Sequence, residues 1–281
     1  MTPADWTGQV GEAWAREWQR TDRSFAGLDP ALDRAILAAV PAGAARLVDI
    51  GCGAGTTSLA VARACPGLAV TGLDLSTDLV AIAEVRRAAA GLASERCRFV
   101  VGDAAEAAAA LAPVDLFFSR HGVMFFDDPV AAFTRLARAA APGAALVFSC
   151  FAALADNPWA TETGGEAGAA PAHPAPGPFA FADPARVAAI LSAAGWCADQ
   201  APERIAFRYV AGAGVDPVGD AVSFFRRIGP AARGLRDADE ASRAVLLDRL
   251  AATCERYRQG KEVAFPAAAW LWSARLREER A

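Results

Sequence analysis

Short apolar runs alternate with longer helical stretches between residues 31 and 150, and this alternation is the feature that most limits the fold. Strands joined by helical segments of about ten to fifteen residues form βαβ units, so we expect a doubly wound parallel sheet covered on both faces. Right-handed crossovers place every strand-to-helix loop at one edge, where such sheets bind ligands. The expected strands of this region are 46–50, 69–75, 98–101, 114–119 and 144–151.

The chain outside this core differs in composition. Residues 1–30 contain three tryptophans and are predicted to form a helical cover on the domain that runs from 31 to 281. Residues 152–184, which include His173, are rich in Ala, Gly and Pro and are expected to form an extended loop. Two late strands, 205–210 and 264–273, enclose a helical insertion at 212–260 that breaks into two pieces at Gly229-Pro230. We expect the loop and the insertion to cover the substrate.

Charge and composition exclude several classes of function. The 28 basic and 32 acidic side chains give a net charge of −4, which is a poor match to a phosphate backbone, so no nucleic-acid partner is expected. Two histidines and the lack of a C-x-x-C pair argue against a metal site. The longest stretch of low charge, 139–155, is interrupted by Pro142-Gly143 and is short for a membrane span. We predict a cytoplasmic protein with free thiols, as a monomer or a homodimer.

A glycine cluster follows the first strand in Val48–Ser58, VDIGCGAGTTS. Glycines there permit positive φ and let a ligand approach the backbone, and the helix beyond supplies unpaired N–H groups. The dinucleotide fingerprint G-x-G-x-x-G fails because Thr56 stands where its third glycine would be, and no Gly-Lys-Ser/Thr of a P-loop is present. Asp49 would repel a pyrophosphate, but it suits a ligand that carries an ammonium group.

Two further aspartates follow the next two strands. Asp74 ends the second strand in GLDLS, and a carboxylate there can accept both hydroxyls of a ribose. Asp103 follows the third strand in FVVGDA, where it can accept from the amine of an adenine ring. Either aspartate alone could be only a helix cap, but three carboxylates in this order favour a ligand site.

The pattern Asp49-x-Gly51-x-Gly53-x-Gly55 resembles motif I of class I S-adenosylmethionine-dependent methyltransferases. The resemblance to this family extends to Pro142-Gly143 and Ala193–Trp196. Four further segments resemble the bacterial subgroup of the ubiquinone/menaquinone C-methyltransferases and trans-aconitate methyltransferases: Trp6-Thr7-Gly8, Ser119–Phe126, Asn157-Pro158-Trp159 and Pro266–Arg275. The resemblance implies an α/β fold with a Rossmann-like, doubly wound, seven-stranded sheet. It also implies S-adenosyl-L-methionine as cofactor and S-adenosyl-L-homocysteine as product.

The resemblance also implies roles for single residues. The cofactor-binding residues would be Asp49, Gly51, Cys52, Gly53, Gly55, Asp74, Leu75, Asp103, Ala104, Ser119, Arg120 and Trp14. Ser119 and Arg120 would lie nearest the methyl group and the methionine carboxylate. Trp14 would cover the cofactor, although its helical spacing from Trp18 is also typical of simple packing.

His121 follows the fourth strand, at the edge where a substrate would arrive. It could be a catalytic base, shape the substrate pocket, or pack in the core. Arg226, Arg227, Arg233 and Arg236 could meet an acidic substrate, or form a solvated helix face.

The sequence therefore predicts a methyltransferase that acts on oxygen or carbon of a small molecule by in-line displacement. Two alternatives stay open. One is an S-adenosylmethionine-binding protein without catalysis, such as a sensor or a partner subunit, and the other is an NAD-dependent oxidoreductase.

Overall fold

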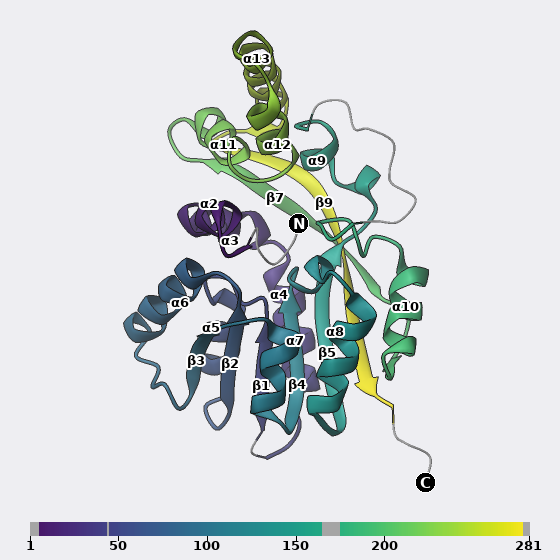
Figure 1. Ribbon diagram of the computed structural model, residues 1–281. Helices are drawn as coiled ribbons and strands as arrows, with labels where there is room; N and C mark the ends of the chain where they lie inside the picture. Colours follow the sequence, from purple (N-terminus) through teal and green to yellow (C-terminus); the bar gives the residue numbers. More distant parts are fainter. Residues whose placement is uncertain (1–5, 44, 165–174, 278–281) are drawn as a thin grey trace.

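A single mixed sheet forms the centre of the computed structural model, which describes residues 6–43, 45–164 and 175–277. The strands lie in the order β3-β2-β1-β4-β5-β9-β6 (Figure 1). Their bounds are β1 Arg46–Ile50, β2 Ala69–Asp74, β3 Cys97–Val101, β4 Val114–Arg120, β5 Ala140–Phe151, β6 Trp196–Ala198, β7 Glu203–Ala213, β8 Arg258–Gln259 and β9 Glu262–Leu276. Strands β1 to β5 pair in parallel, which confirms the expected parallel core.

The helices cover both faces of this sheet (Figure 1). Before β6 they are α2 Gln9–Arg16, α3 Trp18–Phe25, α4 Asp29–Ala39, α5 Thr56–Ala64, α6 Thr77–Ala89, α7 Ala104–Ala107, α8 Pro129–Ala139, α9 Pro158–Thr161 and α10 Pro184–Ala193. Three short 3-10 turns accompany them at Ala108–Leu111, Val123–Phe125 and Leu154–Asp156. The later helices are α11 Pro217–Phe225, α12 Pro230–Asp237 and α13 Glu240–Arg256.

Neighbouring residues of the central strands belong to different hydrophobic clusters, as two buried faces require. In β4, Phe117 packs in the cluster that contains α8 and α10, whereas Leu116 and Phe118 pack in the cluster that contains α4 and α5. This alternation follows from the two-residue period of a strand. The doubly wound architecture is therefore built from continuous apolar runs, because both faces of each strand are buried.

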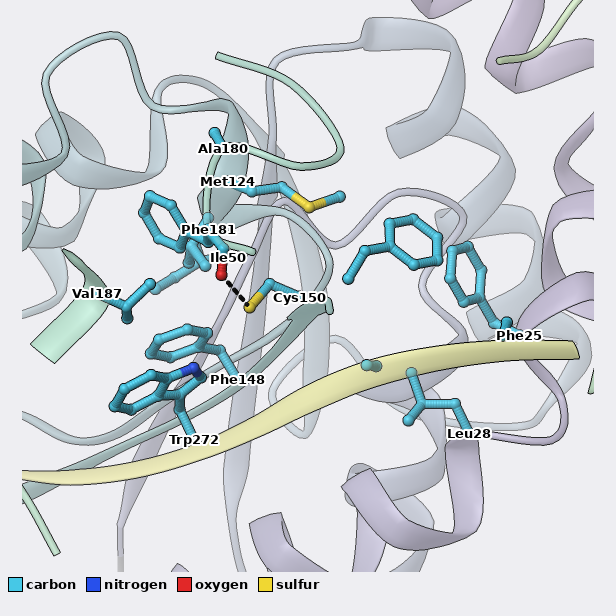
Figure 2. Packing of buried hydrophobic residues seen from close by; sticks show 14 of the residues in the cluster. Phe25, Leu28, Ile50, Met124, Phe148, Cys150, Ala180, Phe181, Val187 and Trp272 are labelled. Carbon is cyan, nitrogen blue, oxygen red and sulfur yellow. Dashed lines mark hydrogen bonds between the residues drawn. The ribbon is translucent and has the colours of Figure 1, made fainter. Parts of the chain in front are cut away.

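The first of these clusters is rich in aromatic rings. Phe148 of β5 stacks on Trp272 of β9 with ring centroids 6.1 Å apart, and Phe181 packs beside them (Figure 2). The Cys150 thiol donates to the carbonyl oxygen of Phe181 at 3.5 Å (Figure 2). All six cysteines are free. The C-terminal strand is thus fixed to the parallel core by large, flat side chains.

Strand β9 accounts for a difference from the expected seven-stranded sheet. Its 15 residues pair with β5 and β6 at one end and with β7 and β8 at the other, so the sheet of the described residues has nine strands. Seven of them form the continuous path given above, while β7 and β8 pair with β9 off this path. Figure 1 shows this two-stranded extension rising away from the parallel core and carrying α11, α12 and α13.

The helical insertion and the loop also differ in detail from the predictions. The insertion contains three helices instead of two pieces, because Asp239 accepts from the Ser242 N–H at 2.7 Å and starts a new helix after α12. The segment predicted as an extended loop contains helix α9 and a 3-10 turn. His173 lies outside the described residues. No helix of the described ranges has the length and apolar character that a membrane crossing needs.

Helices α2 and α3 lie between the parallel core and the extension (Figure 1). Helix α2 contacts α6, and α3 contacts β7. The N-terminal segment is therefore placed over the carboxyl edge of the sheet, as a cover would be.

Candidate active site

A cavity of about 390 Å³ lies at the carboxyl edge of the parallel strands, under the N-terminal helices. The loops after β1, β2, β3 and β4 line it, as expected for a doubly wound sheet. Of the residues predicted to bind a ligand, eleven line this cavity: Trp14, Asp49, Gly51, Cys52, Gly53, Asp74, Leu75, Asp103, Ala104, Arg120 and His121. Gly55 and Ser119 are not among its lining residues.

The three glycines after β1 have left-handed φ angles for different reasons. The φ values are 65° at Gly51, 53° at Gly53 and 82° at Gly55. A Cβ atom at Gly55 would lie 2.6 Å from the ring of Phe99, whereas one at Gly53 would meet nothing within 4 Å. Gly55 therefore permits the turn to pack on the core, and Gly53 leaves the backbone open toward the cavity.

Asp49 is a buried carboxylate with an unused oxygen. Its side chain is 1% exposed, Oδ2 accepts from the Ser58 hydroxyl at 2.6 Å, and Oδ1 has no hydrogen-bond partner among the described residues. Burial raises the pKa of Asp49 to about 7, against the hydrogen bond from Ser58 and the nearby charge of Arg120. An unpaired oxygen of this kind is costly unless a donor or a cation from a ligand reaches it.

Asp74 joins two of the loops. Its Oδ2 accepts from the Gly53 N–H at 2.8 Å, and its Oδ1 accepts from the Ser76 N–H at 2.9 Å. The Ser76 hydroxyl in turn accepts from the Leu79 N–H and caps the start of α6. Burial raises the pKa of Asp74, opposed by these backbone donors. The carboxylate is thus fixed at the cavity wall, and each oxygen keeps a lone pair for a ligand hydroxyl.

Asp103 is an N-cap as well as a lining residue. Its Oδ1 accepts from the backbone N–H groups of Ala105 and Glu106, at 2.8 and 3.1 Å. The helix-cap alternative is therefore correct for this oxygen, and the carboxylate still faces the cavity next to Ala104.

Ser119 and Arg120 differ from their predicted roles. Ser119 is fully buried, donates to the Ile50 carbonyl oxygen at 2.7 Å and accepts from the Gly122 N–H at 3.0 Å, so it braces two loops. Side chains alternate along β4, which is why Arg120 faces the cavity and Ser119 does not. The Arg120 guanidinium is already paired with Asp22 at 2.7 Å and Asp29 at 3.1 Å.

Asp22 of α3 is a residue that the sequence did not single out. Besides Arg120, it accepts from the Thr56 hydroxyl at 2.6 Å and pairs with Arg86 at 3.1 Å. It thereby ties the N-terminal cover to the start of α5 and to the end of β4. The only sequence signal is its helical spacing from Trp18 and Phe25, which places the three residues on one face of α3.

The tryptophans of the cover lie at the cavity. Trp6, Trp14 and Trp18 all line it. Trp6 packs against Trp14 with ring centroids 5.8 Å apart and against Phe125 at 5.0 Å, and Arg86 lies 4.3 Å above the ring of Trp18. Trp14 is therefore both a packing residue and a wall of the cavity.

His121 lies at the inner end of the cavity in a strained conformation. Its φ of 61° is the only positive value among the described non-glycine residues. Nδ1 lies 2.8 Å from the Ser149 hydroxyl, Nε2 has no partner among the described groups, and the ring packs against Phe25 and Phe151. Burial, helped by the charge of Arg120, lowers the pKa of His121 to about 3, so its imidazole is neutral near pH 7.

Comparison with known proteins finds a methyltransferase domain in the parallel core. The model of the methyltransferase domain family matches residues 47–143, which span β1 to the start of β5 and contain the glycine turn and both later aspartates. Residues 47–143 thus match a methyltransferase domain. The match favours this domain over the dehydrogenase alternative.

Relatives and solved structures agree with this methyltransferase domain. The chain is 40% identical over 119 residues to a trans-aconitate 2-methyltransferase of Methylobacterium nodulans, and the match covers 42% of each chain. A putative methyltransferase of Bacillus halodurans superposes with a TM-score of 0.57 at 13% identity, over 88% of this chain and 99% of that one. A phosphoethanolamine N-methyltransferase of Haemonchus contortus, solved with S-adenosylhomocysteine, superposes at 0.50 and 15% identity, over 96% and 58%. The structures support the fold.

Proposed function

We propose that the protein transfers the methyl group of S-adenosylmethionine to an oxygen or carbon atom of a small-molecule acceptor. The observation that carries the proposal is the buried Asp49 carboxylate, whose Oδ1 has no hydrogen-bond partner in the described part of the chain and lies beside an open glycine turn. A cationic amine fits this oxygen, whereas a pyrophosphate does not. The Haemonchus structure with S-adenosylhomocysteine supports the same choice of ligand.

Different residues of the cavity would bind different parts of the cofactor. Asp49 and the backbone of Gly51 to Gly53 would hold the amino-acid end, Asp74 and Leu75 the ribose, and Asp103 and Ala104 the adenine. Trp14 and the other tryptophans would cover it, and aromatic faces favour a positive sulfonium. Arg120 would act through its charge and through its ties to the cover, because Asp22 and Asp29 already take its donors.

Methyl transfer needs positioning and exclusion of water more than proton transfer. S-adenosylmethionine supplies the electrophilic methyl group when it is bound. The chain's own contribution is the fixed cavity and the neutral His121 imidazole, which can accept a hydrogen bond from an acceptor hydroxyl or donate one, depending on its tautomer.

We place the protein in a reducing compartment, the cytoplasm, which the six free thiols support.

The test combines binding and turnover. S-adenosylhomocysteine should bind in a calorimetric titration, NAD should not, and labelled S-adenosylmethionine should label a small molecule of a metabolite extract. Binding of S-adenosylhomocysteine without any labelled product would establish a binding protein without catalysis. Binding of NAD with no response to S-adenosylhomocysteine would overturn the proposal. Light scattering during gel filtration decides between a monomer and a homodimer.

A further inference from the structure

A second cavity, of about 1110 Å³, lies on the other side of Trp14 and Phe25 from the cofactor cavity. These two side chains line both cavities, so they form a shared wall. The second cavity is enclosed by α2, the segment around α9, β7 and the helices α11 to α13. The predicted substrate cover therefore surrounds a space next to the proposed site of methyl transfer.

The inner wall of this second cavity is aromatic. Phe25, Phe151, Trp159, Phe179 and Tyr209 line it. Trp159 stacks on Tyr209 with centroids 4.8 Å apart and planes 10° apart, and Phe151 lies 4.8 Å from Trp159. Fixed, flat rings of this kind bind flat apolar groups by stacking. The same wall reaches His121, because its ring lies 4.3 Å from Phe151.

The outer wall is rich in arginine. Three of the arginines that line the cavity have internal partners: Arg16 pairs with Glu12, Arg227 pairs with Glu17, and Arg243 donates to two backbone carbonyl groups. Arg226, Arg233 and Arg236 also line it, and no ion pair joins them to any residue in the part of the chain that the structure describes. The carboxylates on the wall are Glu12 and Asp237, so positive charge is in excess there.

This local excess is notable because the whole chain has a net charge of −4. Unpaired guanidinium groups beside an apolar cavity favour a carboxylate, since each can donate two parallel hydrogen bonds to it. An aromatic inner wall and a cationic outer wall together define a ligand with an apolar ring at one end and an anionic group at the other.

We propose that the methyl acceptor is an aromatic carboxylic acid, with its ring beside the half-buried rings of Trp14 and Phe179 and its carboxylate at Arg226, Arg233 and Arg236. The acceptor class rests on the proposed methyl transfer, because the reacting end of the ring must lie near the wall that the two cavities share.

The test uses three probes on protein saturated with S-adenosylhomocysteine. The probes are 6-hydroxy-2-naphthoate, its neutral carboxamide, and propane-1,2,3-tricarboxylate, which has the charge without the ring. Calorimetry should show that the naphthoate binds at least about tenfold more tightly than either other probe, as expected for charge-assisted hydrogen bonds added to stacking. Equal binding of the acid and the amide, tighter binding of the tricarboxylate, or no binding of the naphthoate would overturn the proposal.

Paired variants assign the effect to the cavity. Arg233→Gln combined with Arg236→Gln should remove the preference for the acid over the amide. Arg63→Gln combined with Arg249→Gln removes the same charge from exposed positions outside both cavities and should keep it. An equal loss of the preference for the acid over the amide in both double variants would overturn the proposal. Failure of S-adenosylhomocysteine itself to bind would instead contradict the proposed function, so the two failures are distinguishable.

Discussion

The carboxyl edge of the parallel core and the C-terminal extension build their cavities in opposite ways. At the edge, carboxylates accept hydrogen bonds from backbone N–H groups of their own loop or of the neighbouring loop, as Asp74 does from Ser76 and Gly53. In the extension, large rings and arginines converge from α2, β5, β7 and α11 to α13. The comparison teaches that a loop site can be fixed by local backbone geometry, whereas a substrate wall depends on long-range packing.

The largest effect on the free energy of unfolding should come from the glycine turn at the carboxyl edge of the sheet. Gly55→Ala places a Cβ against Phe99 in a left-handed conformation and should lower the free energy of unfolding by about 2–5 kcal/mol. Gly53→Ala meets no atom and should cost only about 1–2 kcal/mol, but it should weaken S-adenosylhomocysteine binding. Denaturant unfolding and calorimetry measure the two quantities. Equal destabilisation by both changes would show that packing on Phe99 is not what Gly55 provides.

Substitution of Asp74 tests whether the carboxylates at the carboxyl edge bind the cofactor in addition to holding the loops together. Asp74→Ala should weaken S-adenosylhomocysteine binding by about 1.5–3 kcal/mol, because a charge-assisted hydrogen bond to the ribose is lost. Asp78→Ala, at an exposed position of α6, is the matched control and should leave the dissociation constant unchanged. An unaltered constant for Asp74→Ala would place the ribose elsewhere.

Asp49 gives a pH test of the same edge. Because the pKa of the buried carboxyl is raised to about 7, this group makes the free protein less stable as pH rises from about 4 to 7, by up to about 1.4 kcal/mol per pH unit. A bound ammonium group should ionise it, so S-adenosylhomocysteine binding should release roughly 0.9 proton at pH 6 and roughly 0.1 at pH 8. Calorimetry in buffers of different ionisation enthalpy measures this release. Asp49→Asn should abolish it, and proton uptake at pH 6 would contradict the assignment.

The smallest effect should come from the ion pairs that connect the cover to the extension. Asp220 of α11 accepts from Arg20 at 2.7 Å and from the Ala213 N–H at 3.0 Å, and it pairs with Arg23 at 2.8 Å. Asp220→Asn should lower the free energy of unfolding by about 1 kcal/mol, and less at high salt. Asp199→Asn, in an exposed pair at 3.9 Å, should have no measurable effect. A salt-independent loss at Asp220 would assign the effect to its backbone hydrogen bond alone.

The same difference between local geometry and long-range packing explains which site residues could be predicted from the sequence. Asp49, Asp74 and Asp103 were found from sequence because parallel strands end at one edge, so a residue just after each strand reaches the same cavity. Ser119 was misplaced because one step along a pleated strand reverses the direction of a side chain. Asp22 was missed because its partners, Thr56, Arg86 and Arg120, meet only when a remote helix docks.

The strand count and the loop show a similar limit. The apolar run at 264–273 predicted a last strand, but the run itself could not show that β9 would pair with four strands. Likewise, the Arg-rich sequence of the insertion is compatible with a solvated helix face and with an acid-binding surface. Only the position of α12 beside the aromatic wall favours the second.

By itself, the sequence determined the parallel core, the positions of its strands along the chain and the carboxylates at its edge, because periodicity and turn chemistry act over a few residues. The tertiary structure decided which oxygen of Asp49 lacks a partner, where Arg120 finds its counter-charges, and how an aromatic wall comes to face unpaired arginines. These properties depend on burial and on contacts between residues far apart in the chain, which a local pattern does not contain.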